Sequence, residues 1–199
     1  EGKLVRQLQK FVDSLKWELP KHELLLPKFQ TPEGKTSQDY LQEICQQSLK
    51  EKELVETPNV KTIRDLAEFL NCDEKDTVKA IAIKDEKGYY LILLRGDHTL
   101  NEVKVKKYLG ISDYEMTDVK EIQDIYLSFD GFMGPIGLGE KVKIYADNAI
   151  KYMKNYTVGA NKENYHYINV NNNDYNVEGY YDLREIVEGE IAEDGSRKS

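Results

Sequence analysis

Two strand-like stretches joined by a short polar turn constrain the fold more than any other part of this sequence. Residues 77–84 alternate side chains of different size and polarity and are rich in β-branched residues, which predicts a β-strand with two different faces. Lys87 and Gly88 mark a hairpin turn, and the nearly continuous apolar run of residues 89–95 predicts a returning strand covered on both faces. Lys79 therefore projects from the middle of a pleated surface, where its chemistry depends on what lies over it.

The composition indicates a globular chain with one sizeable domain, or one such domain and a smaller helical piece. The formal net charge of −8 argues against a free-standing nucleic-acid binder, because neutralising phosphates requires a basic face. It leaves open a module that a larger protein delivers to RNA. No apolar run approaches the about eighteen residues of a membrane span and no signal-peptide pattern is present, so we expect a cytoplasmic protein without membrane contact. Cys45 and Cys72 are too few and too far apart to suggest a metal site or disulfide framework, and we expect no metal and no cofactor.

The remaining patterns divide the chain into a leading helical portion and a mixed region. Apolar residues at helical spacing predict helices over residues 3–19 and 37–50, before a stop at Thr57 and Pro58. After that stop we predict a helix over residues 63–70 that Thr62 caps, a helix over residues 101–108, and a short helix or turn-rich segment over residues 119–126. We also predict strands over residues 141–147 and 165–170 and a helical turn over residues 149–153.

These elements predict an α/β domain with a mixed, largely antiparallel curved sheet and flanking helices, preceded by a helical leader. We place the leader, of unknown role, at residues 1–52 and the α/β domain at residues 53–190. Residues 191–199 form a polar tail that we expect to be mobile.

A glycine cluster spans residues 131–139 and is too rich in glycine for an ordinary link between strands. Glycine lets the backbone approach a ligand closely, so the cluster can present N–H groups to it. Taken alone, such a loop is more often a simple turn.

Several motifs occur here in one order: Thr57-Pro58-Asn59-Val60-Lys61-Thr62, Asp76-Thr77-Val78-Lys79, the run from Arg95-Gly96-Asp97-His98 to Lys104, Gly131-Phe132-Met133-Gly134-Pro135, and Val158-Gly159-Ala160-Asn161-Lys162 with Tyr165-His166-Tyr167. Together they closely resemble the editing insertion domain of bacterial prolyl-tRNA synthetases, of the YbaK-type deacylase superfamily. The resemblance covers about residues 54–195. Residues 1–52 do not match what precedes this insertion, and residues 26–45 faintly resemble a linker of bacterial replicative polymerases.

The resemblance implies hydrolysis of the ester of alanine wrongly attached to tRNA(Pro). A synthetic pocket shaped for proline cannot strongly reject a smaller amino acid, because a missing methylene is worth only about 1 to 3 kcal/mol, and a second, smaller sieve corrects the error. The implied partners are the tRNA(Pro) acceptor end carrying alanine and the remainder of a prolyl-tRNA synthetase, in cis or in trans. No synthetase motifs for ATP or proline activation are present, so proline-tRNA ligase activity would require a longer parent chain.

The resemblance also implies the site. Lys79 matches the family's essential lysine, which holds the terminal adenosine phosphate or steadies the ester, although a lone lysine on a strand is ordinarily a surface residue. The loop of Gly131 and Gly134 supplies backbone donors for the oxyanion of ester hydrolysis. His166 shapes the alanine pocket and contacts the amino group or a water, without acting as a strong base. The catalytic candidates are Lys79, Gly131, Gly134 and His166, and the substrate-binding candidates are Thr57, Thr77, Met133, Pro135 and Asp147.

Other residues have structural roles that compete with catalytic ones. Asp147 could equally cap the turn that begins at Asn148. His98 is favoured as part of a helix cap with Asp97 and Asn101. No side chain is an obvious nucleophile backed by a base, so the resemblance implies attack by water, aided by the terminal ribose hydroxyl of the tRNA.

Two alternatives stay open at this point. The same fold could deacylate another mischarged ester, such as cysteinyl-tRNA(Pro), because the volume of a pocket cannot be read from a sequence. The chain could also be a non-catalytic module that binds the tRNA acceptor end.

Overall fold

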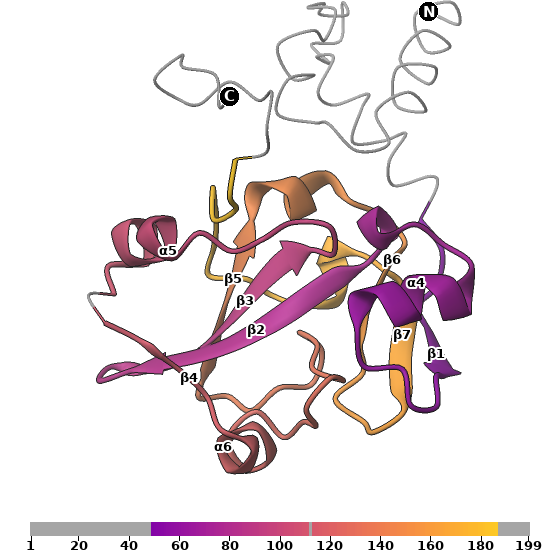
Figure 1. The fold of residues 1–199 in the computed structure, drawn as a ribbon, viewed down its shortest axis with the longest axis horizontal. Helices are drawn as coiled ribbons and strands as arrows, with labels where there is room; N and C mark the ends of the chain where they lie inside the picture. Colours follow the sequence, from indigo (N-terminus) through magenta and orange to yellow (C-terminus); the bar gives the residue numbers. More distant parts are fainter. Residues whose placement is uncertain (1–48, 112, 187–199) are drawn as a thin grey trace, which may run out of the picture.

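The structure, a computed structural model, describes residues 49–111 and 113–186 (Figure 1). The helix predicted over residues 3–19, nearly all of the helix predicted over residues 37–50 and the tail at residues 191–199 lie outside the described residues.

A five-stranded mixed sheet forms the centre of the fold, with the strand order β4-β2-β3-β5-β8. β2 (Val78–Asp85) and β3 (Gly88–Arg95) pair antiparallel as the predicted hairpin, and Asp85 opposes Gly88 across the turn. β5 (Val142–Asp147) pairs parallel with β3, β8 (Gly179–Tyr181) pairs parallel with β5, and β4 (Glu115–Met116) pairs antiparallel with β2. The long hairpin crosses the middle of Figure 1.

A second, antiparallel sheet has the order β1-β7-β6 and is formed by β1 (Glu53–Glu56), β7 (Tyr165–Val170) and β6 (Tyr156–Gly159). An isolated parallel bridge between Thr77 and Thr157 joins the start of β2 to β6. The predicted α/β class with a mixed, largely antiparallel sheet is confirmed, but the strands divide into two sheets instead of one. The sequence analysis did not predict β1, β4, β6 or β8.

The helices begin and end where the capping residues predict. They are α4 (Ile63–Leu70), α5 (Glu102–Leu109) and α6 (Val119–Asp124), with short 3-10 turns η2 (Glu74–Asp76), η3 (Asn148–Tyr152) and η4 (Asn172–Asp174). The Thr62 and Asn101 side chains accept from backbone N–H groups of the first turns of α4 and α5, as predicted. None of the helices in the described ranges has both the length and the apolar character needed to cross a bilayer.

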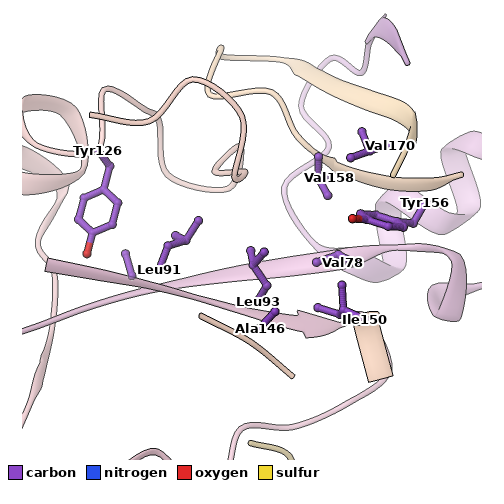
Figure 2. Close-up of a cluster of buried hydrophobic side chains, with 10 residues drawn as sticks. Val78, Leu91, Leu93, Tyr126, Ala146, Ile150, Tyr156, Val158 and Val170 are labelled. Atoms are coloured by element: carbon purple, nitrogen blue, oxygen red, sulfur yellow. The ribbon is translucent and has the colours of Figure 1, made fainter. Parts of the chain in front are cut away.

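Both faces of β3 are covered, as predicted. Leu91 and Leu93 face one cluster, to which Val158 of β6 and Val170 of β7 also belong. Figure 2 shows this cluster filling the space between the two sheets. Ile92 and Leu94, on the opposite face, pack in a second cluster that includes Val105 of α5. Burying both faces fixes the hairpin, and with it the position of Lys79 on β2.

Candidate functional site

Thr57 and His166 form a buried hydrogen-bonded pair at the end of the three-stranded sheet. Antiparallel pairing places Val55 opposite His166, and the ladder continues with a bond from Thr57 N to Asn164 O of 2.7 Å. This register puts Thr57 Oγ1 2.6 Å from His166 Nδ1. Both side chains are buried, at 0% and 4% exposure. The pair therefore has a fixed geometry.

Burial makes His166 a neutral imidazole. Removing the ring from water lowers its pKa from 6.5 to about 4. The Nε2 atom makes no hydrogen bond within the described residues, and it is not among their fully buried unpartnered atoms, so it keeps contact with solvent. The lowered pKa makes His166 a weak base, and its Nε2 atom is the position at which it could hold a water or a substrate group. The pocket role given to His166 by the sequence stays a prediction.

The glycine loop packs against His166 through Phe132. The two rings lie with centroids 5.5 Å apart. Phe132 N donates to Phe129 O at 3.0 Å and closes a turn, in which Gly131 takes a positive φ of 82°. Glycine adopts this left-handed conformation without a steric cost. The turn thus places Phe132, directly after Gly131, against the histidine.

Gly134 and Gly159 allow the loop to touch the end of β6 backbone to backbone. A Cβ at Gly134 would lie 1.8 Å from Gly159 O, and a Cβ at Gly159 would lie 2.2 Å from Met133 O. Gly159 also pairs with His166 across β6 and β7. The contact therefore joins the glycine loop to the strand that carries the histidine.

Asn161 clamps this contact, a role that the sequence analysis did not assign. Its Oδ1 accepts from Gly134 N at 2.9 Å, and its Nδ2 donates to Gly134 O at 2.9 Å and to Ile136 O at 2.7 Å. Its own N–H donates to Phe132 O at 2.8 Å. Asn161 was present in the fifth motif, and its polar side chain two residues after Gly159 was the available signal.

The clamp changes which loop amides can face a ligand. Gly134 was expected to offer its N–H to an oxyanion, but in this geometry the N–H already donates to Asn161. The N–H groups of Gly131 and Met133 make no hydrogen bond within the described ranges. Within the segment 131–134, these two amides replace Gly134 as the candidate donors for a bound carbonyl oxygen. Pro135 is buried directly after Gly134 and restricts the backbone at the exit of this segment.

Lys79 lies on β2, and within the described residues it makes no hydrogen bond to the histidine or to the glycine loop. A bridge aligns the start of β2 with β6. It joins Thr77, two residues before Lys79, to Thr157, two residues before Gly159. Lys79 Nζ donates to Gly96 O at 3.0 Å. Burial lowers the pKa of Lys79, while the negative charges of Asp97 and Glu74 act in the opposite direction.

Asp147 and Thr77 are occupied by structural hydrogen bonds. Asp147 is 1% exposed, and its carboxylate accepts from Ala149 N at 2.9 Å and from Leu183 N at 2.8 Å. This is the cap that the sequence left open as an alternative to a pocket role. The Thr77 hydroxyl donates to Glu74 O at 2.7 Å.

The predicted cap of α5 is confirmed for Asn101 only. Asp97 instead pairs with Arg95, and His98 Nε2 lies 3.9 Å from Asp97 Oδ1. Within the described ranges, no group of three or more His, Cys, Asp or Glu residues is placed to hold a metal ion.

Comparison with known proteins identifies the class that this fold and site define. The family model of the aminoacyl-tRNA editing domain matches residues 57–175. This is more than half of the chain, and the chain belongs to that family. Among solved structures, a candidate trans-editing enzyme for prolyl-tRNA synthetase has a TM-score of 0.60 over 67% of this chain and 87% of its own, at 19% identity, which shows the fold alone.

Within the family, curated proteins similar to this chain include proline–tRNA ligases. The ligase of Macrococcus caseolyticus is 43% identical over 145 residues, 72% of this chain and 25% of the relative. That of Bacillus pumilus is 44% identical over 147 residues, 73% of this chain and 26% of the relative. The chain thus spans about a quarter of the length of these relatives. The resemblance to the editing domain of prolyl-tRNA synthetases is confirmed.

We predict that Gly159→Ala lowers the free energy of unfolding by about 3 kcal/mol, because backbone atoms cannot make room for the added methyl group. Gly137→Ala is the matched control: its added Cβ meets nothing within 4 Å, and its φ of 78° leaves only a strain of about 1 kcal/mol. Urea unfolding measures both variants. Equal losses would show that the contact between Gly159 and the loop is not tight.

We predict that His166 makes the free energy of unfolding depend on pH. Its pKa is about 4 when folded and 6.5 ordinarily, so between these values the unfolded state binds more protons, and stability falls as the pH falls. Between pH 7 and pH 5 the wild type should lose about 2 kcal/mol more than His166→Gln in urea titrations. The same loss in both proteins would mean that His166 titrates normally.

Proposed function

We propose that the chain hydrolyses the ester of alanine wrongly attached to tRNA(Pro). The main support is that a glycine loop with N–H groups unoccupied within the described residues packs, through Phe132, against a buried histidine that its surroundings keep neutral. Thr57 fixes the histidine at 2.6 Å, and Asn161 fixes the loop. A fixed polar site of this kind suits a reaction that develops charge on a carbonyl oxygen.

In the proposed reaction a water attacks the ester carbonyl. Its oxygen bonds to the carbonyl carbon, the bond to the ribose oxygen breaks, and a proton passes to that oxygen. The amides of Gly131 and Met133 stabilise the oxyanion, and His166 Nε2 holds the amino group or the water. The Lys79 ammonium steadies the ester or the adenosine phosphate as a point charge.

A covalent route through cysteine has little support in the described residues. Cys72 lies just after α4, and burial, followed by the charges of Asp76 and Asp73, raises the pKa of its thiol. The thiolate is the nucleophilic form, so a raised pKa makes this cysteine unreactive at neutral pH. Water is therefore the nucleophile that we propose.

Substrate delivery requires more than this domain. The net charge of −8 disfavours strong binding to the phosphates of free tRNA. We propose that the remainder of a prolyl-tRNA synthetase, in cis or in trans, supplies affinity for the acceptor end, and that ligation of proline belongs to a longer parent chain.

A panel of esters tests the proposed substrate. We predict that the chain releases alanine from alanyl-tRNA(Pro) and leaves prolyl-tRNA(Pro) intact, because proline is too large for a pocket shaped for a methyl side chain. Cysteinyl-tRNA(Pro) is measured in parallel, and faster release of cysteine would favour the alternative substrate. Binding of tRNA without turnover of any of the three esters would contradict catalysis.

We predict that Lys79→Ala lowers the rate of alanine release by about 100-fold or more, the scale of losing one group that stabilises developing charge. Lys143→Ala, at an exposed lysine of β5, is the matched control and should keep the wild-type rate. Single-turnover assays measure the rates, and thermal melting checks that both variants fold. A Lys79→Ala protein with the wild-type rate would refute the assignment of this lysine.

A further inference from the structure

The Lys79 ammonium is held by a carbonyl group at the end of the neighbouring strand. Lys79 Nζ donates to Gly96 O at 3.0 Å, and this is its only hydrogen bond within the described ranges. Gly96 lies one residue beyond β3. Whatever orients the Gly96 peptide therefore also orients the ammonium.

The Gly96 peptide is itself fixed on one side by η2 and the residue after it. Gly96 N donates to Thr77 O at 2.8 Å. A Cβ at Gly96 would lie 2.1 Å from Thr77 Oγ1 and 2.4 Å from Glu74 O, so only glycine fits here. The backbone thus presses directly against residues 74–77.

Arg95 and Asp97 fix the peptide from its two ends. Arg95 Nε donates to Asp97 Oδ1 at 2.6 Å, and Arg95 Nη2 donates to Asp97 Oδ2 at 2.9 Å. The side chains are 11% and 25% exposed, so solvent screens the pair only partly. A two-bond contact between a planar guanidinium and a carboxylate has a defined geometry, and here it closes a ring across Gly96.

We propose that Arg95 and Asp97 are positioning residues for Lys79: their paired side chains hold the Gly96 carbonyl in the orientation that directs the Lys79 ammonium toward the bound ester. This inference rests on the proposed function, in which Lys79 acts on that ester. Neither Arg95 nor Asp97 needs to touch the substrate.

The charge of Asp97 is a separate contribution that can be distinguished from positioning. Burial raises the pKa of Asp97, but the hydrogen bond and charge of Arg95 outweigh it, and the net pKa lies below the ordinary value. Asp97 is therefore ionised, and with Glu74 of η2 it opposes the lowering of the Lys79 pKa by burial. Glu74→Gln removes a charge near Lys79 and leaves the pair of Arg95 and Asp97 intact.

The test measures kcat and KM for alanyl-tRNA(Pro) in variants of the full chain. Arg95→Lys keeps the charge but loses the two-bond geometry, and Asp97→Asn keeps the shape but loses the charge. Each should lower kcat by about 10- to 100-fold with little change in KM, because the Lys79 ammonium is misplaced while the surface that binds the substrate is unchanged. Glu74→Gln should keep most of kcat at neutral pH.

Glu121→Gln is the matched control, because it breaks a different ion pair, the one that Glu121 forms with Lys84 of β2. Its carboxylate lies 2.6 Å from Lys84 Nζ, farther along the same strand. This variant should keep the wild-type kcat. If breaking the pair of Lys84 and Glu121 lowers kcat as much as breaking the pair of Arg95 and Asp97, then the second pair has a merely structural role, and the inference is overturned.

A double-mutant cycle with Lys79→Ala makes the test specific. If Arg95 and Asp97 act through Lys79, then Arg95→Lys should cause no further loss of the residual rate in the Lys79→Ala background. A further loss of about tenfold when Arg95→Lys is added to Lys79→Ala would overturn the positioning role. So would an unchanged kcat in both Arg95→Lys and Asp97→Asn, provided that Lys79→Ala itself lowers the rate. An inactive wild type would instead refute the proposed function.

A measurement on the unmodified protein covers the case in which the variants do not fold. With ¹³Cε-labelled lysine, an oriented Lys79 should show two distinct Hε resonances by NMR, whereas the exposed Lys143 should show one averaged signal. An averaged signal for Lys79 would overturn the inference.

Discussion

The backbone contact between Gly134 and Gly159 is the constraint on which the candidate site depends. Side chains normally separate a loop from a strand, but here two glycines let carbonyl groups and Cα atoms meet directly. The clamp of Asn161 then satisfies the polar groups that this close approach buries. Because Gly159 also pairs with His166, the loop and the histidine are held as one unit.

Burial gives the site its chemical character. The same removal from water that keeps His166 neutral also raises the pKa of the Cys72 thiol and lowers that of the Lys79 ammonium. Only at Lys79 do neighbouring carboxylates oppose the effect, so a positive charge can persist there. The described residues thus combine a neutral imidazole at His166 with an ammonium held at Gly96, and they hold no activated thiol. Under the proposed function, this combination suits stabilisation of an oxyanion better than attack by a side chain.

Local patterns predicted the parts of the fold that depend on local physics. The hairpin of β2 and β3 followed from alternation and a polar turn, and the start of α4 followed from the Thr62 cap. The short strands β1, β4 and β8 were missed because they are stabilised by pairing with partners distant in sequence. β6, which pairs with β7 through an irregular register, was not predicted either. For the same reason the sequence did not reveal that the strands form two sheets.

The candidate site shows the same division. The motifs named Thr57, His166 and the glycine loop, and the structure places them together. The sequence could not show that Gly134 N–H is already taken by Asn161, because that contact forms only after folding. It offered the cap by Asp147 as one of two alternatives but could not reveal the second bond of this carboxylate, to the distant Leu183 N. Nor could it show that Lys79 is held at Gly96, on the neighbouring strand.

The most direct test of the site is a crystal structure with a stable analogue of 3′-alanyl adenosine in which an amide replaces the ester. The account predicts that the alanyl carbonyl oxygen accepts from the N–H of Gly131 or Met133, with the methyl group facing His166 and the Lys79 ammonium on the adenosine side. An analogue bound on another face of the protein, away from the glycine loop and the histidine, would contradict it.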